Sequence, residues 1–461
     1  MNKSLLKELI SFRKKEKISM HIPGHKSGRG LGAYFRKNAF NIDLTELSGT
    51  DNLQNPNGIL KSSQDNCAKI FGAEETLFLT GGSSLGLRAM ILGCVPRGGK
   101  LLVDRCCHKS VISAIALGGV EPIFLAPDFD EDLGLYLGVS VQEVKTKLEA
   151  HPDVCGAIIT SPNYYGVCSD VSAIADLLHK DNKFLMVDEA HGAHFVFDRQ
   201  NLPQTALSLG ADLCVQSAHK TLPSLGQTSL LHINKNAIIN KGRLIRTLRL
   251  IQTTSPSYMM MASLDEATRY MDADGRKRLK DIAGEIEKLK RVVAQKSALR
   301  FVDEGVLNRP QDVTRIVVDF LPLGIGGYEA EKILAEEFRI YAEMADNRYV
   351  VFIPSAVTKK REIEKLGKAL CKIEKRKDKN NEVQKNMRLP EIDIQIAPDK
   401  AIDKEFEVVD IKDALGHISA GVVSACPPGA AVLVPGQYID EDAAMFLVKN
   451  KVAEKVEVIV G

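Results

Sequence analysis

Short runs of apolar residues alternate with longer amphipathic segments between about residues 65 and 220. The runs are TLFLT (76–80), KLLVD (100–104), EPIFLA (121–126), GAIITSP (156–162), KFLMVDEA (183–190) and ADLCVQSA (211–218). The segments between them, such as SLGLRAMILGCV and DVSAIADLLHK, have the apolar spacing of helices. This alternation predicts an α/β fold with a mainly parallel sheet and helices on both faces. Ligands of such sheets bind beyond the carboxyl ends of the strands, so chemistry is expected directly after each run.

Outside this region the pattern changes. The first residues read as a helix followed by a glycine-rich arm, HIPGHKSGRG, that we expect to lie over another part of the molecule. After residue 257 come a long charged helical stretch (258–297) and strand-like runs around the helix YEAEKILAEEF. We therefore predict five parts: an N-terminal helix and arm (1–50), a large domain (51–257), a small α+β domain (258–372), a polar linker (373–388) and a C-terminal domain (389–461).

Composition narrows the class of protein. The 461 residues are 44% hydrophobic and carry a formal net charge of +2, so the charge balance does not favour nucleic acid or an anionic membrane as partner. No apolar run approaches the ~20 residues of a membrane span, and the N-terminus lacks a signal-peptide core. The nine cysteines lie mostly in apolar or motif-rich stretches, which is typical of free thiols in a reducing compartment. We expect a soluble cytoplasmic protein.

Polar residues with a chemical use follow two of the apolar runs. Gly81-Gly82-Ser83-Ser84 leads from the first run into a helical segment, and its backbone N–H groups and hydroxyls suit a phosphate; a simple tight turn is the alternative. Asp188 ends KFLMV, where a buried carboxylate needs a cationic partner such as a protonated pyridine nitrogen, unless it only caps a turn. His191 and His194 follow without a third ligand, so we expect no metal site.

Lys220 completes a set at the strand ends. It follows ADLCVQSA, and a partly desolvated lysine has a lowered pKa and forms Schiff bases, although a lone lysine at a strand end is more often at the surface. A phosphate loop, an acid and a lysine in this order are what pyridoxal phosphate (PLP) requires. The sequence therefore predicts a PLP enzyme that holds its cofactor as a Schiff base on Lys220.

Nine motifs, spread from near the N-terminus to near the C-terminus, carry a resemblance to a known family. They are HIPGHKSGRG, GTDNLQNPNG, FLTGGSSLG, DRCCHKSV, SPNYYGVCSD, VDEAHGAHF, SAHKTLPSLGQ, QTTSPSYMMMASLD and PPGAAVLVPG. With them the chain resembles the Orn/Lys/Arg decarboxylase family, in the short form of Gram-positive bacteria. The resemblance implies an aspartate-aminotransferase-like fold (fold type I) and decarboxylation of lysine, arginine or ornithine to a diamine or agmatine, as in polyamine biosynthesis. It also implies a homodimer with shared active sites, or a higher oligomer.

The resemblance assigns roles to individual residues. Lys220 is the Schiff-base lysine, Asp188 pairs with the pyridine nitrogen, and His108 and Ala190 lie on the two faces of the ring, although His108 also suits an ordinary helix cap. A proton returns to Cα from Lys220 or a neighbouring histidine. The remaining cofactor contacts are expected from Ser83, Ser84, His191, Ser217, His219 and, across a dimer interface, Thr254.

The substrate end of the site is less defined. Asp51, Glu343 and Asp346 are candidates for binding a distal cation, and each suits a surface acid equally well. The resembling family usually has a glutamate where this chain has Gln437, so we expect Gln437 to weaken or change substrate binding. SLGQ in place of the usual ALTQ puts Gly226 near the predicted pocket.

Two other functions stay open on the sequence. One is a PLP enzyme with an altered substrate or reaction, such as an aminotransferase, which would need an arginine holding the substrate carboxylate in the ring plane; no motif indicates one. The other is a PLP-binding protein with a regulatory or partner-binding role.

Overall fold

The computed structural model describes residues 4–373, 386–425 and 429–460. The predicted linker (373–388) falls mostly on residues 374–385, which lie outside the described residues. Within the described part of the chain, strands form two larger sheets and four two-stranded pairs, and each of the two larger sheets lies within one of the predicted parts. Among the described residues, no helix is both long and apolar enough to span a membrane.

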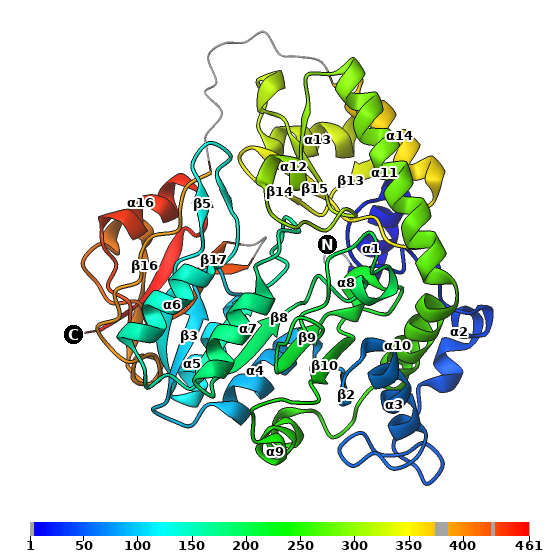
Figure 1. The fold of residues 1–461 in the computed structure, drawn as a ribbon. Coiled ribbons are helices and arrows are strands. Elements are labelled where there is room, and N and C mark those ends of the chain that lie inside the picture. The colour runs from blue at the N-terminus through cyan, green and yellow to red at the C-terminus, as the bar shows by residue number, and fades with distance from the viewer. Residues whose placement is uncertain (1–3, 374–385, 426–428, 461) are drawn as a thin grey trace.

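A seven-stranded sheet forms the centre of the large domain (Figure 1). Its order is β2 (Glu75–Leu79), β10 (Ser229–Ile233), β9 (Leu213–Gln216), β8 (Phe184–Asp188), β7 (Gly156–Thr160), β3 (Lys100–Asp104) and β4 (Glu121–Leu125). Strands β9, β8, β7, β3 and β4 run parallel, whereas β10 is antiparallel to both β9 and β2. The predicted mainly parallel sheet is confirmed. Strand β10 was not predicted from the sequence; its connection from β9 contains only the four-residue helix α8 (Ala218–Thr221).

Helices cover both faces of this sheet, because successive strand residues point to opposite sides. In β3, Leu101 and Val103 pack in one core with α4 (Gly82–Cys94), α5 (Lys109–Gly118) and α9 (Lys241–Ile251). Leu102 packs in the other core with α6 (Val141–Ala150) and α7 (Val171–Lys180). Buried apolar residues on both faces explain the continuous apolar runs of the sequence.

A second sheet belongs to the small domain. It follows the long helical stretch α10 (Tyr258–Tyr270) and α11 (Arg276–Lys296), joined by a π-helical turn. The sheet order is β11 (Arg300–Val302), β12 (Ile316–Asp319), β15 (Tyr349–Phe352) and β14 (Met344–Ala345), with α12 (Glu304–Leu307), α13 (Gly327–Glu337) and α14 (Lys360–Leu370) beside it.

The N-terminal arm attaches to this small domain. After α1 (Leu5–Lys15), strand β1 (Ile18–Ser19) pairs in parallel with β13 (Ile340–Tyr341), and α2 (Ala33–Asn38) and α3 (Ile59–Phe71) follow. Met20 and Ile18 are buried in the small-domain core. The arm therefore lies over another part of the chain, as expected.

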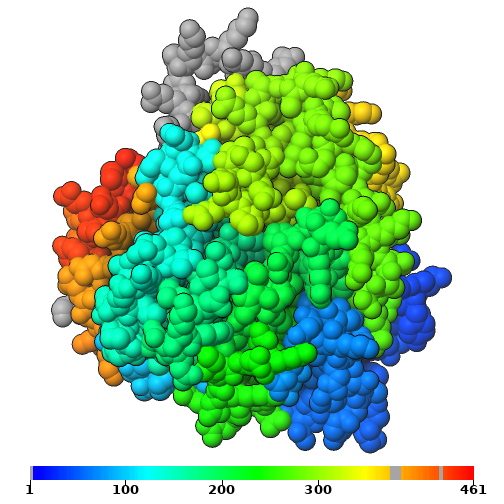
Figure 2. Space-filling view, in the orientation of Figure 1, coloured from blue at the N-terminus to red at the C-terminus, as the bar shows by residue number. Residues whose placement is uncertain are grey.

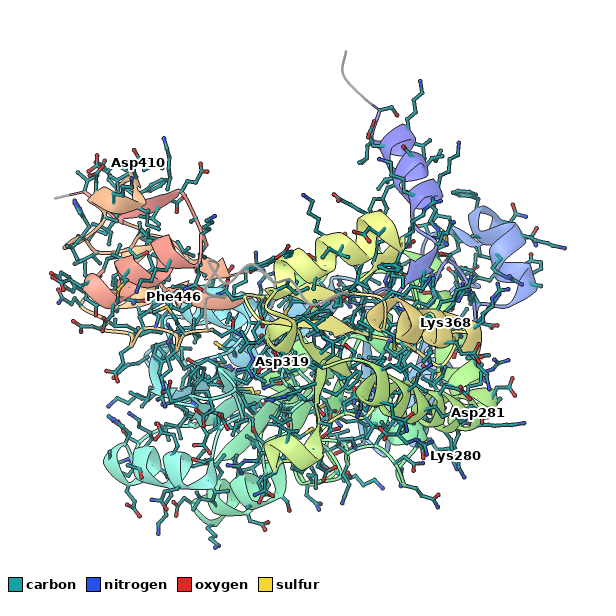
Figure 3. The ribbon with its side chains drawn as sticks, turned by 90° about the horizontal axis from the view of Figure 1, so that it is seen from above. Lys280, Asp281, Asp319, Lys368, Asp410 and Phe446 are labelled. Atoms are coloured by element: carbon teal, nitrogen blue, oxygen red, sulfur yellow. The ribbon has the colours of Figure 1, made fainter. Side chains whose placement is uncertain are left out.

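The C-terminal residues form a third unit beside the large domain. It contains β16 (Phe406–Asp410) paired with β19 (Lys455–Ile459), β17 (Val423–Ala425) paired with β18 (Ala430–Leu433), and the helices α15 (Pro398–Ala401) and α16 (Glu441–Lys449). In the space-filling view this orange-to-red segment lies against the cyan large-domain segment (Figure 2). Seen from above, α16 with Phe446 lies on the opposite side of the molecule from the blue N-terminal helix (Figure 3).

Candidate active site

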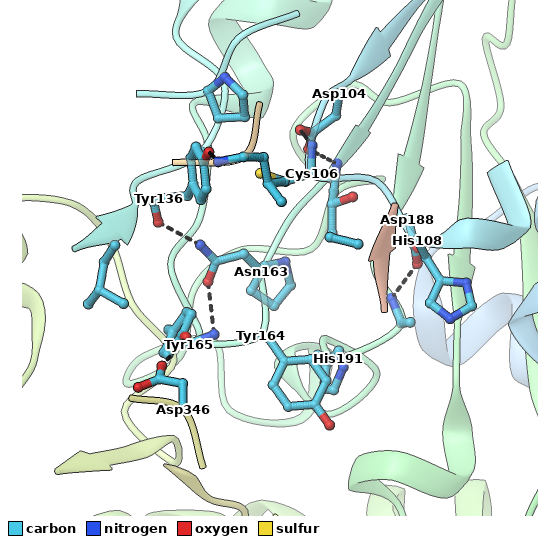
Figure 4. A pocket seen from close by; sticks show the side chains of 18 of the residues that line it. Asp104, Cys106, His108, Tyr136, Asn163, Tyr164, Tyr165, Asp188, His191 and Asp346 are labelled. Carbon is cyan, nitrogen blue, oxygen red and sulfur yellow. Dashed lines mark hydrogen bonds between the residues drawn. The ribbon is translucent and has the colours of Figure 1, made fainter. Parts of the chain in front are cut away.

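A cavity of about 590 Å³ lies at the carboxyl ends of the parallel strands (Figure 4). This is the volume of an ordinary small-molecule site. The hairpin of β5 (Phe129–Asp130) and β6 (Leu135–Tyr136) lies on one side of it, and residues of the small and C-terminal domains also line it. The cavity brings together nine of the ten predicted cofactor contacts: Ser83, Ser84, His108, Asp188, Ala190, His191, Ser217, His219 and Lys220.

Lys220 and Asp188 form the charged centre of the cavity. Lys220 lies in α8, and its Nζ is 2.9 Å from His191 Nε2. Burial lowers the pKa of the Lys220 amine, although the negative charges of Asp188 and Glu343 oppose this. Asp188 ends β8, is 4% exposed, and accepts a hydrogen bond of 3.1 Å from the Ala190 N–H. Burial raises the pKa of Asp188, against the pull of Lys220 and His108. The pair thus combines a lysine of lowered pKa with a buried acid, as the sequence indicated.

Hydroxyl groups gather at the N-terminus of α4. Ser217 Oγ donates to Ser83 Oγ over 2.9 Å, and Ser110 Oγ donates to Ser84 Oγ over 2.8 Å. Gly82, at φ +73°, begins the helix and donates its N–H to the Gln227 carbonyl over 2.9 Å. Hydroxyl hydrogens rotate freely, so these side chains can turn toward an anion at the helix start.

His108 caps a helix and also lies in the cavity lining, whereas its expected place on the cofactor ring stays a prediction. Its Nδ1 accepts the Ser110 N–H over 3.2 Å and so caps α5, while the ring also lines the cavity. Burial lowers the pKa of His108, which favours a neutral ring. Gly429, at φ +84°, packs so closely that a Cβ there would lie 2.9 Å from His108 Cδ2. The C-terminal domain thus holds the His108 ring in place.

These residues fit PLP. Serine hydroxyls and a helix N-terminus at one end suit a phosphate, a buried carboxylate suits a protonated ring nitrogen, and an amine of lowered pKa suits an aldehyde. The donor set contains each group that the cofactor needs, within one cavity.

The predicted substrate acids separate in the structure. Asp346 lines the cavity, where its carboxylate accepts from Tyr165 Oη (2.5 Å), the N–H groups of Arg348 and Tyr349 (2.7 Å each) and Asn386 Nδ2 (3.1 Å). Burial raises its pKa. Glu343 is not among the lining residues; it accepts from the Tyr164 hydroxyl and from the Ile22 N–H at 2.8 Å, and so ties the N-terminal arm to the site.

Four other residues singled out in the sequence lie away from the cavity lining. Asp51 caps α3, accepting from the N–H groups of Asn57, Gly58, Leu60 and Lys61. Gln437 is 0% exposed and bonds to the Val434 N–H and the Glu391 carbonyl, so its side chain is engaged within the protein and is not part of the cavity lining. Thr254 is exposed, and its expected contact, which needs a second subunit, stays a prediction. Gly226 is exposed beside the lining residue Gln227.

Sequence reasoning missed several residues of the site. Arg315 is 2% exposed, and its Nη2 lies 3.2 Å from His191 Nδ1. A charged residue opening the apolar run TRIVVDF was the available signal, since a buried charge requires a partner. Tyr164, in the quoted motif SPNYYGVCSD, packs edge-on to His191 with ring centroids 4.7 Å apart. No local sequence pattern indicated that residues of the C-terminal domain, such as Ala430 and Phe446, would line the cavity.

Comparison with known proteins decides the family. The model of the Orn/Lys/Arg decarboxylase major domain matches residues 3–315, and that of the family's C-terminal domain matches residues 377–456. The chain belongs to the Orn/Lys/Arg decarboxylase family. It is 32% identical to an arginine decarboxylase of Bacillus subtilis over 447 residues, 95% of this chain and 91% of that one. An arginine decarboxylase of Bacillus cereus is 34% identical, over 94% of this chain and 96% of that protein.

Solved structures confirm the fold. A lysine decarboxylase of Francisella novicida superposes with a TM-score of 0.79 at 20% identity, covering 95% of this chain and 78% of that chain. Lysine decarboxylase A of Pseudomonas aeruginosa gives a TM-score of 0.79 at 19% identity, over 98% and 80% of the two chains. The protein is thus an enzyme of this decarboxylase family and has the fold of type I PLP enzymes. PLP dependence is a general property of the family.

Proposed function

We propose that this enzyme holds PLP on Lys220 and decarboxylates a basic L-amino acid, with arginine as the first candidate, to release CO2 and agmatine or a diamine. The observation that carries the proposal is the meeting of Lys220, buried Asp188 and the serine hydroxyls in one cavity. Arginine comes first because relatives at 32–34% identity over most of the chain are named arginine decarboxylases.

Different residues of the chain are assigned to different parts of this reaction. When bound, PLP supplies the electron sink for the electron pair left at Cα as CO2 departs. Asp188 holds a proton on the ring nitrogen, because its buried carboxylate is most stable beside a cation. His108 and Ala190 are assigned to the two faces of the ring, and Lys220 with its neighbour His191 is the source of the proton that returns to Cα.

One feature of the lining favours decarboxylation over transamination. Among the described residues that line the cavity there is no arginine, and the guanidinium of Arg315, behind the lining, is bonded to His191. For the distal cation we assign Asp346, since it is the acid among the three candidates that lines the cavity.

The proposal includes a homodimer in the cytoplasm, acting in polyamine biosynthesis. Exposed large apolar side chains gather near the N-terminus, at Leu5, Leu6, Leu9, Ile10, Phe12, Tyr34, Phe40, Leu44, Leu47 and Ile59. Such a concentration is typical of a surface that a second subunit covers. Eight free cysteines among the described residues fit a reducing compartment.

The test begins with the purified protein reconstituted with PLP. The visible absorbance band of the lysine-bound cofactor is expected in the wild type and in the exposed-lysine control Lys235→Ala, and is expected to be absent in Lys220→Ala. CO2 release is then measured with arginine, lysine, ornithine and close analogues. A band that survives in Lys220→Ala contradicts the cofactor assignment. A normal band without CO2 from any substrate would favour an altered reaction or a PLP-binding regulatory role.

A further inference from the structure

His191 lies between two basic side chains, one at each ring nitrogen. Its Nε2 is 2.9 Å from Lys220 Nζ, and its Nδ1 is 3.2 Å from Arg315 Nη2. The ring is 5% exposed and is held edge-on by Tyr164. Both contacts are short enough to be hydrogen bonds, so the question is which atom donates in each.

The guanidinium decides the direction of both bonds. An arginine side chain has five N–H donors and no acceptor, so Arg315 donates and His191 Nδ1 must accept without a proton. A neutral imidazole with a bare Nδ1 carries its proton on Nε2. That Nε2–H points at Lys220 Nζ, which can accept it only as a neutral amine, since an ammonium group has no free lone pair.

The charges around His191 agree with a neutral ring. Burial, together with the positive charges of Lys220, Arg315, His219 and His194, lowers the pKa of His191 well below its usual value. Burial and the positive charge of Arg315 lower the pKa of the Lys220 amine, whereas the negative charges of Asp188 and Glu343 raise it. Burial and the basic groups around His191 therefore disfavour a cationic imidazole.

The surroundings of Arg315 hold its side chain in position to donate to His191. It is 2% exposed, its backbone N–H donates to the Asp312 carbonyl over 2.9 Å, and its Nη2 is 3.8 Å from the Asp312 carboxylate. Its Nε and Nη1 have no hydrogen-bond partner within the described residues. The contact with His191 is thus the side-chain hydrogen bond that fixes the orientation of a buried guanidinium.

We infer that Arg315 is a positioning residue that locks His191 in its Nε2–H tautomer, and that His191 thereby holds Lys220 as the free amine that reacts with PLP. The inference rests on the proposed function, because it assigns the device that prepares Lys220 for that cofactor. The reaction needs the amine lone pair: it attacks the aldehyde carbon, a carbon–nitrogen double bond forms, and the aldehyde oxygen leaves as water with the two amine protons. A protonated Lys220 has no lone pair and cannot begin this step.

The first experiment reads the tautomer in the cofactor-free protein. Histidine labelled with ¹⁵N gives different ring-nitrogen shifts for the two tautomers, and the His191 signals are identified by their loss in His191→Gln. We expect the Nε2–H tautomer in the wild type and in Arg315→Lys, which keeps a charged donor, and a mixed or Nδ1–H state in Arg315→Met. A wild-type spectrum with the proton on Nδ1, or on both nitrogens, overturns the inference. This readout does not depend on PLP binding, so it is separate from a failure of the proposed function.

The second experiment measures the rate of PLP uptake by the cofactor-free protein against pH. In Arg315→Met, Lys220 loses a nearby cation and regains a possible acceptor at Nε2, so its profile is expected to move to higher pH. If the profile moves by about one pH unit, uptake becomes about tenfold slower below the Lys220 pKa. Arg315→Lys is expected to stay near the wild-type profile.

Two outcomes of these variants would overturn the assignment. One is a folded Arg315→Met whose tautomer and uptake profile are both unchanged. The other is an Arg315→Met that raises only KM for the amino acid, which would make Arg315 a substrate ligand. If Arg315→Met does not fold, the wild-type spectrum and Arg315→Lys still decide.

Discussion

Replacing Asp51 tests whether this acid shapes the fold or binds the substrate. In the structure its two carboxylate oxygens accept backbone N–H groups at the start of α3, with distances from 2.7 Å (Gly58) to 3.3 Å (Lys61). Asp51 also has φ +70°, a left-handed conformation that aspartate and asparagine tolerate better than alanine. These backbone bonds lower the pKa of Asp51 to about 2. Such an arrangement indicates a structural cap.

The magnitude follows from these features. A lowering of the pKa from 3.8 to about 2 corresponds to roughly 2.4 kcal/mol at most, and the exposure of this side chain reduces it to about 1 kcal/mol. Loss of a cap costs about 0.5–2 kcal/mol, and alanine adds about 1 kcal/mol of left-handed strain. Asp51→Ala is therefore expected to destabilise the α3 start by about 2 kcal/mol, and Asp51→Asn by less than about 1 kcal/mol. Because the folded pKa is depressed, the carboxylate contribution is present above about pH 4 and is lost as the pH falls toward 2.

Hydrogen–deuterium exchange of residues 52–62, followed by mass spectrometry, measures this directly. A local loss of about 2 kcal/mol speeds exchange by roughly 30-fold in Asp51→Ala, with Asp51→Asn between it and the wild type. KM for the amino acid is expected to stay within a factor of two or so of the wild type. Unchanged exchange together with a KM raised about tenfold would refute the reasoning and return Asp51 to the substrate site.

Three further substitutions test other parts of the site. Ser83→Ala is expected to weaken PLP binding by about tenfold or more, measured by titration of the cofactor-free protein, because it removes one of the hydroxyls at the start of α4 that we propose as phosphate ligands. Asp346→Asn is expected to raise KM for arginine about tenfold or more with a smaller change in kcat; an unchanged KM would exclude Asp346 from the distal site. Gln437→Met is expected to lower the free energy of unfolding by about 1–3 kcal/mol, because the buried Val434 N–H loses its acceptor, and to leave KM unchanged. A Gln437→Met protein of normal stability and altered KM would contradict its placement outside the cavity.

The centre of the site was predictable because one rule connects sequence and space. The carboxyl ends of parallel strands meet at one edge of the sheet, so polar residues directly after apolar runs converge. By this rule Asp188, Lys220 and the serines near Gly82 line one cavity, although more than a hundred residues separate the first from the last. The apolar runs in the sequence also located the strands that precede these residues.

The remaining parts were not predictable because they depend on contacts between distant segments. Strand β10 reads as a continuation of the lysine motif, and its antiparallel pairing follows from a short connection that no local pattern shows. Gly429 reaches His108, and Asp346 enters the cavity, through the packing of domains. The family resemblance suggested Gln437 as a substrate contact, and only the structure shows that its side chain is buried and bonded to Val434 and Glu391.

Arg315 makes the chemistry of Lys220 depend on how two domains meet. It precedes β12 of the small domain, whereas His191 and Lys220 belong to the large domain. Its bond to His191, at 3.2 Å, is already at the long end of the hydrogen-bond range, so a relative shift of about 1 Å would break it. His191 could then carry its proton on Nδ1 and accept at Nε2 a hydrogen bond from a charged Lys220. On the inference above, the free amine of Lys220 depends on the packing of the small domain against the large domain.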